Sequence, residues 1–315
     1  MIDIVTLEAM LPTERRSTTI DPRSLFYLGI APPKFGKTTW FSCIPDSLLV
    51  AFERGFHFQT VPTIFIDVWD QRRGQFEPYQ DEYDITHMTM VQLAEALVNS
   101  DKYKFIIFDT ADMAAKKCTD FQCGQHGWTH ATDGGDYGKG WDIAQNTPFR
   151  HMVNKILGTG RGVGFITHSQ INTTDLGKGK KSKKETSLPS GIYKYLHAQA
   201  DIILHGSFGV KQKGNVYRDR VWQTEGDEET LAGTRSRELI LPAKFIIDPD
   251  KPWEQWLSFF ENQANSTEAE RQYMEAFRRK APETPEEEPA PAQAENGEGK
   301  QVSRESAPRK KASKE

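Results

Sequence analysis

The segment 31–39, Ala-Pro-Pro-Lys-Phe-Gly-Lys-Thr-Thr, has the residue types that bind a polyphosphate. The apolar stretch 25–28 predicts a buried strand before it, and 40–44 predicts the start of a helix after it. In this context consecutive backbone N–H groups wrap phosphates, and the helix N-terminus adds partial positive charge. We expect Lys37 to reach the β- and γ-phosphates and the Thr38 hydroxyl to hold Mg²⁺. The expected nucleotide-binding residues are Pro33, Lys34, Phe35, Gly36, Lys37, Thr38 and Thr39.

One position departs from the general P-loop pattern G-x-x-x-x-G-K-[ST]. Ala31 occupies the place of the first glycine, and Gly29 is out of register with it. An alanine is tolerated where φ is negative and is costly where φ is positive. Pro32 and Pro33 also remove two N–H donors from the loop. A chance Gly-Lys-Thr in a turn is the alternative, and the other motifs of the chain argue against it.

A carboxylate follows the apolar segment 104–108 directly. Asp109 therefore ends a predicted buried strand, which is the Walker B arrangement. Such a carboxylate, next to a P-loop, orients the water shell of Mg²⁺, so Thr38 and Asp109 are the expected metal-site residues. Asp112 is nearby, but it falls on the following helix and is the weaker candidate.

Two more polar residues end predicted strands. Glu53 follows 48–52, and a glutamate there can activate the water that attacks the γ-phosphate; the alternative is a surface glutamate paired with Arg54. His168 follows 163–167, where a polar side chain can detect the γ-phosphate; the alternative is an ordinary histidine bonded to a carbonyl. Parallel strands bring such residues to one edge of a sheet.

Short apolar or β-branched runs alternate with helical patterns from residue 24 to about 250, which predicts an α/β fold with a mostly parallel sheet. A helix is expected at 89–98, and another after Thr147 as N-cap and Pro148 in the first turn. The predicted strands are 25–28, 47–52, 63–68, 104–108, 162–167 and 200–205, followed by an antiparallel strand at 216–224, a possible partner at 238–241 and an aromatic helix at 253–260.

This order of motifs resembles the RecA-like core ATPases, including small phage RecA-like recombination ATPases, and most closely the phage nucleotide-binding proteins of the AAA type. The resemblance covers about 24–250 and rests on 33–39, 51–55, 106–110, 137–141 and 164–169. It implies a RecA-like P-loop core that uses ATP and Mg²⁺ and assembles into rings or filaments with nucleotide at subunit junctions. It also implies the catalytic set, which is Lys37 of the P-loop, Glu53 as the catalytic glutamate, Asp109 of Walker B and His168 as the γ-phosphate sensor.

A basic segment follows His168. Residues 171–190 hold five lysines against Asp175 and Glu185, a net charge of five minus two, or +3. A flexible loop of this kind can contact phosphates, and in RecA-like proteins the loop at this place contacts single-stranded DNA. A solvated loop is the alternative, and no aromatic residue lies within the lysine run to support base stacking. The DNA-binding candidates are Lys178, Lys180, Lys181, Lys183 and Lys184.

Two smaller clusters leave alternatives open. Arg235 and Arg237 are candidates for contact with a neighbouring subunit's nucleotide, or are ordinary surface arginines. Four possible zinc ligands lie close together in the sequence, but their spacing matches no familiar finger, and packed cysteines with surface histidines are the preferred interpretation. They are Cys118, Cys123, His126 and His130.

The whole chain limits the classes of function. It has 315 residues, a formal net charge of −4 and three cysteines, so nucleic-acid binding requires a local basic patch and a disulfide framework is not expected. No apolar run approaches the ~20 residues of a membrane span, and we expect no membrane partner and a cytoplasmic location, in the host if the chain is phage-encoded. We expect a lead-in at 1–23, an ATPase domain at 24–262, a helix at 263–280 and a disordered tail at 281–315, acidic and then basic, which is a solvated tail or an electrostatic arm.

Together these features predict an ATPase, stimulated by DNA, that acts on single-stranded DNA in phage recombination or replication. A homo-oligomer and a single-strand-binding or replication protein are the expected protein partners. One alternative is an ATP-dependent loader or regulatory module that acts on a protein without touching DNA. Another is a nucleotide-binding protein with little hydrolysis.

Overall fold

The computed structural model describes residues 20–70, 76–175, 180–209, 218–227, 230–235, 239 and 241–261, and for 171–184 it describes the backbone alone. The chain divides into two units, 1–267 and 268–315, and all described residues belong to the first. The expected helix at 263–280 and the expected tail at 281–315 lie outside the described residues.

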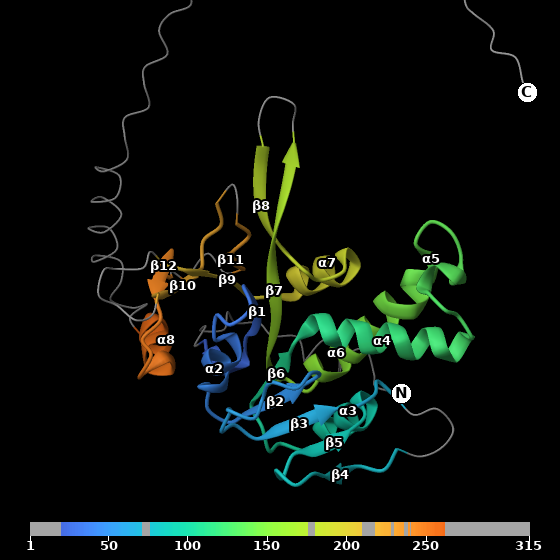
Figure 1. Ribbon diagram of the computed structural model, residues 1–315. Helices are drawn as coiled ribbons and strands as arrows, with labels where there is room; N and C mark the ends of the chain where they lie inside the picture. The colour runs from blue at the N-terminus through green and yellow to red at the C-terminus, as the bar shows by residue number, and fades with distance from the viewer. Residues whose placement is uncertain are drawn as a thin grey trace, which may run out of the picture. The chain divides into compact units, whose positions relative to one another are not determined.

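One sheet runs through the described part of the chain (Figure 1). Its strand order is β12-β10-β9-β1-β7-β6-β2-β3-β5-β4, with β11 beside β9 and β8 beside β7. All six strands predicted for the core are present. The strands are β1 (Phe26–Ala31), β2 (Ser47–Ala51), β3 (Thr63–Ile66), β4 (Tyr79–Gln80), β5 (Thr86–Met88), β6 (Phe105–Asp109), β7 (Gly162–Asp175), β8 (Lys180–Thr186), β9 (Ile202–Phe208), β10 (Arg220–Gln223), β11 (Gly233–Thr234) and β12 (Lys244–Ile246).

The centre of the sheet is parallel and its margins are antiparallel. Strands β9, β1, β7, β6, β2, β3 and β5 pair in parallel, whereas β10, β11, β12, β4 and β8 pair antiparallel to their neighbours. Strand β7 lies between β1, which leads into the P-loop, and β6, which ends at Asp109. This confirms the predicted α/β fold with a mostly parallel central sheet.

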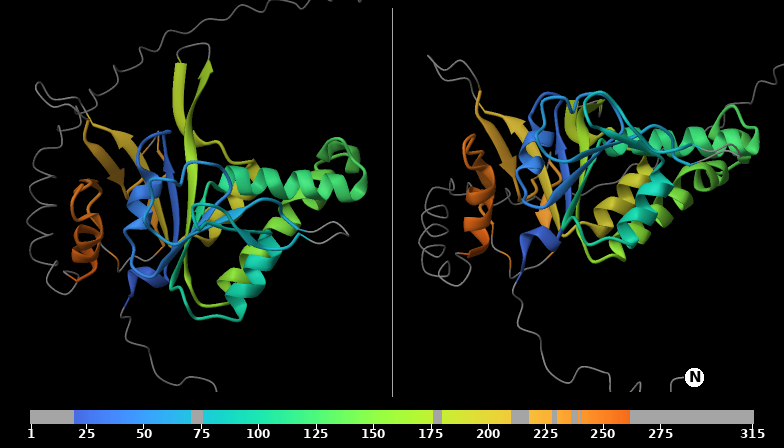
Figure 2. Two further views of the ribbon diagram at one scale, coloured as in Figure 1. Left: turned by 60° about the horizontal axis from the view of Figure 1, so that its bottom comes forward. Right: turned by 90° about the horizontal axis from the view of Figure 1, so that it is seen from below.

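Helices cover both faces of the sheet (Figure 2). Alternate residues of β1 point to opposite faces, so Leu28 and Ile30 pack under one group of helices and Tyr27 packs under the other. The first group is α3 (Met90–Val98), α4 (Ala111–His126), α6 (Thr147–Leu157) and α7 (Ser190–Gln199), and the second is α2 (Lys37–Ser42) and α8 (Pro252–Glu261). The remaining helical turns are η1 (Pro22–Ser24), η2 (Ala131–Gly134), α5 (Lys139–Trp141) and η3 (Asp142–Asn146).

Several local predictions can be compared with the structure. The helix at 89–98 is confirmed, and Thr89 and Gln92 form a reciprocal capping box. The helix after the P-loop begins at Lys37 rather than near residue 40. Thr147 is not an N-cap, because the π-helical turn η3 runs directly into α6 and gives the helix an earlier start.

The end of the predicted ATPase domain also differs from the prediction. The strand expected at 216–224 is confirmed only as β10, and 216–217 lie outside the described residues. Its partner is β12 at 244–246, because Leu239 and Leu241 lie outside any strand and the rest of 238–241 is not described. The predicted aromatic helix is confirmed as α8, and its Trp256 is fully buried beside Tyr27.

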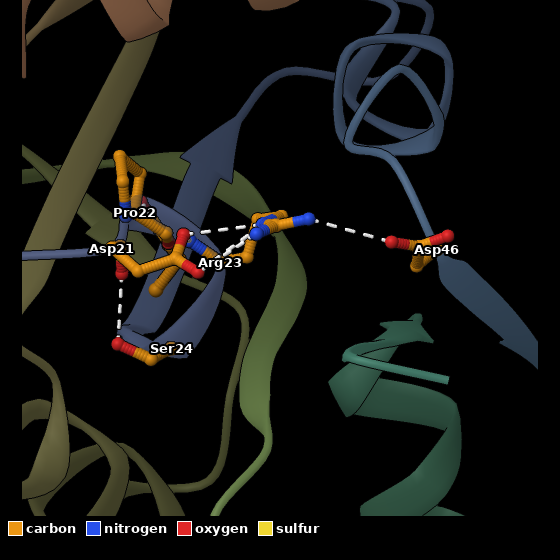
Figure 3. A network of polar contacts seen from close by, with 6 residues as sticks. Asp21, Pro22, Arg23, Ser24 and Asp46 are labelled. Atoms are coloured by element: carbon orange, nitrogen blue, oxygen red, sulfur yellow. Dashed lines mark hydrogen bonds and ion pairs between the residues drawn. The ribbon is translucent and has the colours of Figure 1, made fainter. Parts of the chain in front are cut away.

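A polar network holds the chain where β1 begins (Figure 3). The Arg23 guanidinium donates to the Asp21 carboxylate at 3.0 Å and to Asp46 at 3.4 Å, and Ser24 Oγ donates to Asp21 O at 2.8 Å. Asp46 directly precedes β2, so Arg23 joins the amino ends of two central strands. Among the helices in the described ranges, none combines the length and apolar character that crossing a membrane requires.

Candidate nucleotide-binding site

The polar residues predicted at strand ends meet at the carboxyl edge of the sheet. In the strand register Ala31 lies opposite His168, and Ala51 lies opposite Asp109. Glu53 follows Ala51 by two residues, and Phe52 N donates to Asp109 O at 2.9 Å. The parallel sheet therefore brings the P-loop, the glutamate, the aspartate and the histidine to one place, as the sequence predicts.

Lys37 is at the centre of this site and is only 5 % exposed. Its ammonium donates to the carbonyl oxygens of Ala31 at 2.9 Å and Pro32 at 3.0 Å, and lies 3.1 Å from His168 Nδ1. Burial lowers the pKa of Lys37 to about 8, although the charges of Asp109, Asp112 and Glu53 oppose the shift. The Lys37 ammonium has lost most of its contact with water, and a bound anion would compensate for that loss.

The metal-site candidates contact each other directly. Thr38 Oγ1 donates to Asp109 Oδ2 at 2.7 Å, from the first turn of α2 to the end of β6. Burial raises the pKa of Asp109, while the Thr38 hydrogen bond and the Lys37 charge oppose the rise. A hydroxyl and a carboxylate at this distance are a donor set that suits Mg²⁺, which prefers oxygen ligands together with water and phosphate.

The loop geometry explains the departure at Ala31. Ala31 is the last residue of β1, and the left-handed φ values fall later, at Lys34 with 63° and Gly36 with 90°. Room for the Ala31 methyl comes from Gly206 on β9, because a Cβ on that glycine would lie 2.5 Å from Ala31 Cβ. The alanine therefore leaves the loop conformation intact.

The side chains of the loop point in different directions. Phe35 is fully buried and packs against Trp222, with ring centroids 4.7 Å apart, so any contact of Phe35 with nucleotide comes from its backbone. The backbone N–H of Phe35 donates to Pro32 O at 3.3 Å within the loop. Together with the two prolines, this leaves Lys34, Gly36, Lys37, Thr38 and Thr39 as the loop residues whose N–H groups remain for a ligand.

Glu53 is exposed at the same edge. Its carboxylate accepts a long hydrogen bond, 3.4 Å, from Thr110 Oγ1, the hydroxyl next to Asp109. Its charge opposes the fall that burial causes in the pKa of Lys37 and in the pKa of His168. An accessible carboxylate at this edge of the sheet is suited to accept a proton from water.

Asp112, the weaker metal candidate, has another place in the site. It accepts hydrogen bonds from Thr167 Oγ1 at 3.2 Å, from His168 N at 3.4 Å and from Ser187 Oγ. Burial lowers the pKa of His168, the Lys37 charge adds to this effect, and the Asp112 and Glu53 charges oppose it. Asp112 thus holds β7 at His168. The only signal for this in the sequence was an acid in the first turn after Asp109.

The lysine segment after His168 is a β-hairpin, not the flexible loop that the sequence predicts. Strand β7 continues past His168 to Asp175 and pairs antiparallel with β8, from Ser169 opposite Thr186 to Asp175 opposite Lys180. The hairpin projects from the edge of the sheet (Figure 1). Lys178 lies outside the described residues, and the side chains of the other four candidates, Lys180, Lys181, Lys183 and Lys184, are not described.

The remaining candidates lie elsewhere. Arg235 contacts its own chain, because its guanidinium donates to Ala198 O and lies 3.9 Å from Asp201, while Arg237 lies outside the described residues. Cys118 is fully buried, and burial raises the pKa of its thiol. His126 stacks on Trp128, and within the described ranges no three histidine, cysteine or carboxylate residues are grouped as metal ligands.

The chain is similar in sequence to a protein family and to a curated protein. A family model described as an AAA domain matches residues 24–236. The SPbeta prophage-derived uncharacterized protein YorG of Bacillus subtilis (strain 168) is 28 % identical over 158 residues, which are 49 % of this chain and 46 % of that protein. The chain thus spans about half the length of this curated relative.

Among solved structures, the KaiC-like protein PH0186 of Pyrococcus horikoshii OT3 aligns with 72 % of this chain and 87 % of its own, at 12 % identity and a TM-score of 0.36. The family match is the stronger finding, since it includes β1, the P-loop, Asp109 and the hairpin and spans more than half of the 315 residues. The protein therefore belongs to the AAA-domain family.

Proposed function

We propose that the chain binds ATP with Mg²⁺ and hydrolyses the γ-phosphate. The observation that carries this proposal is the meeting of Thr38 with Asp109, at 2.7 Å, and of Lys37 with His168, at 3.1 Å, on one edge of the sheet. When bound, Mg²⁺ neutralises charge on the β- and γ-phosphate oxygens.

Each residue has a role that follows from its present contacts. The Lys37 ammonium exchanges loop carbonyls for phosphate oxygens, and Thr38 and Asp109 hold the metal. Glu53, exposed at the same edge of the sheet, accepts a proton from the attacking water, and His168 contacts the γ-phosphate from the strand next to β1.

The proposal extends to single-stranded DNA as the partner of the β7–β8 hairpin. Support comes from continuity, because β7 carries His168 and then the hairpin without a break. The hairpin segment has five lysines, including Lys178, and a local charge of the sign that binds phosphate backbones. The prophage origin of the relative YorG supports a role in phage recombination or replication.

We also propose that identical chains assemble into a ring or filament. Arg235 and Arg237 are the candidates for contact with the nucleotide of a neighbouring chain. A single-strand-binding or replication protein is the proposed further partner. Arg235 already contacts Ala198 and Asp201, so in an assembly its side chain must either give up these contacts or keep them while it contacts the neighbouring chain.

The test is the steady-state ATPase rate at low salt, titrated with single-stranded DNA, double-stranded DNA or no DNA. We expect Mg²⁺-dependent turnover that single-stranded DNA increases, and loss of ATP binding in Lys37→Ala. Unchanged ATP affinity in Lys37→Ala would refute the P-loop assignment. If single-stranded DNA neither binds nor raises turnover, the DNA role is wrong, and an ATPase acting on a protein partner takes its place.

A further inference from the structure

Arg220, the first residue of β10, lies against the phosphate-binding loop. A Cβ on Gly36 would lie 2.6 Å from Arg220 Nη1, 3.2 Å from Cζ and 3.7 Å from Nε. The guanidinium therefore faces the glycine that directly precedes Lys37, from a strand nearly two hundred residues further along the chain. Gly36 also has a left-handed φ of 90°, so both its backbone and its surroundings exclude a side chain.

Packing below the loop fixes this position. The Phe35 ring packs edge-on against Trp222 of β10, at 4.7 Å, and against Phe208 of β9, at 5.8 Å. Residues two apart in a strand share a face, so Arg220 is on the same face as Trp222, and its register partner is Phe208. Strands β9 and β10, which pack against Phe35 of the phosphate-binding loop, thus place Arg220 next to that loop.

The guanidinium has no acidic partner among the residues that the structure describes, and Arg220 is exposed. It is a permanent cation with several N–H donors in a planar fork, a shape that matches phosphate oxygens. Beside a loop whose free N–H groups are suited to bind an anion, this arginine is a second positive group in addition to Lys37.

The strand order indicates which phosphates it would contact. Lys37 and His168 meet on the side of β7, which is where the γ-phosphate is proposed to lie. Arg220 approaches from the other side of β1, where β9 and β10 lie beside the P-loop helix α2 (Figure 1). An ATP molecule with its γ-phosphate at His168 then extends its α- and β-phosphates toward Arg220.

We propose that Arg220 is a nucleotide-binding residue of the same subunit that contacts the α- and β-phosphates from β10. This inference rests on the proposed ATP site and adds to it a residue outside the P-loop segment. Because the contact is with phosphates that ATP and ADP share, Arg220 serves affinity for both nucleotides, in contrast to an arginine finger that detects only the γ-phosphate.

The test is calorimetric titration of the full chain with Mg·ATP, Mg·ADP and adenosine, for the wild type, Arg220→Ala and Arg220→Lys. We expect Arg220→Ala to weaken ATP and ADP binding alike, by about 10-fold or more, the effect of losing a charge-assisted hydrogen bond. Arg220→Lys keeps the positive charge but lacks the planar guanidinium, so its affinities for ATP and ADP should lie between those of the wild type and Arg220→Ala. Adenosine binding should not change.

Lys244→Ala on β12 is the matched control, because Lys244 is also an exposed base on the neighbouring strand but not at the loop; its affinities should stay within about two-fold of wild type. The melting temperature of Arg220→Ala should equal that of wild type, as expected for an exposed side chain. Equal ATP affinity in wild type and Arg220→Ala overturns this inference alone, as does a loss confined to ATP. If the wild type binds no nucleotide, the proposed function fails as well.

Discussion

Two segments leave the carboxyl edge of the sheet next to each other, the loop after β1 and the hairpin that continues β7, and they are held in different ways. The loop is anchored from inside, by the fully buried Phe35 ring and the nearly buried Lys37. At the base of the hairpin, Asp112 accepts hydrogen bonds from the hydroxyls of Thr167 and Ser187, and Thr186 Oγ1 lies 2.9 Å from Thr167 Oγ1.

The different anchoring of the loop and of the hairpin suits them to different tasks. An anchored loop presents a fixed set of donors, as binding of a compact phosphate chain requires. A two-stranded arm fixed at its base can change position as a unit when the base changes. His168 belongs to both, since it faces Lys37 and also lies one residue from the hairpin register. In the proposed function, the first segment takes part in the chemistry and the second contacts the partner.

The largest effect should come from the chemical step. Glu53→Gln should lower kcat for ATP by about 10²–10⁴-fold, because the amide cannot accept the proton of the attacking water, while the affinity for ATP stays close to wild type. Steady-state kinetics and ATP titration measure the two quantities separately. Glu95→Gln, an exposed change on α3, is the control and should leave both unchanged. If Glu53→Gln turns over ATP at the wild-type rate, the general base is a residue other than Glu53.

A smaller effect follows from the buried lysine. The pKa of Lys37 is about 8 in the free protein, and bound phosphate should raise it. ATP affinity should be flat at low pH, where both states carry the proton, and should fall by up to about 10-fold per pH unit as pH rises above 8, because binding must then take up a proton. Titrations from acid to alkaline buffers test this. Lys37→Arg stays protonated, so its profile should remain flat; a flat wild-type profile would contradict the expectation.

Much of this core was predictable from the sequence, because strands buried on both faces are continuous apolar runs and their polar ends mark the edge of the sheet. The P-loop, Asp109, Glu53 and His168 were found in this way and do converge. What could not be found depends on pairing between distant segments. The hairpin requires the register of β7 with β8, and a lysine-rich, glycine-rich segment has no alternating apolar pattern to predict it.

The same limit applies to single residues. Asp112 was recognised as an acid near Asp109, but its hydrogen bonds to Thr167 and Ser187 depend on the hairpin base. Arg220 has no motif around it, and only the packing of β10 under Phe35 places it at the loop. The space for the Ala31 methyl likewise depends on Gly206, a residue far away in the chain.

The base of the hairpin can be weakened directly. Asp112→Ala removes the acceptor of the His168 N–H and one of the two partners of each hydroxyl, since Thr167 keeps Thr186 Oγ1 and Ser187 keeps His168 O. The change should lower the free energy of unfolding by about 1–3 kcal/mol. Hydrogen exchange at the amides of His168 and Ser187 should accelerate, while amides in β1 remain protected. Asp120→Ala on the same helix loses only an exposed pair with Lys116 and should cost less than about 1 kcal/mol. Equal effects of the two changes would mean that Asp112 does not hold the hairpin.

The smallest effect is expected at the position where the P-loop departs from its pattern. Ala31→Gly restores the usual glycine, yet ATP affinity should change by less than about 3-fold, because Ala31 ends β1 and the left-handed residues are Lys34 and Gly36. The free energy of unfolding should fall by about 1–2 kcal/mol, since a buried methyl is lost beside Gly206 and a strand residue gains backbone freedom. Denaturant titration and ATP binding measure both. A large gain in ATP affinity would show that the alanine limits nucleotide binding by the loop. A loss of stability without that gain means that the anchoring of the loop extends into β1, so the proposed phosphate-binding segment is held by the sheet itself.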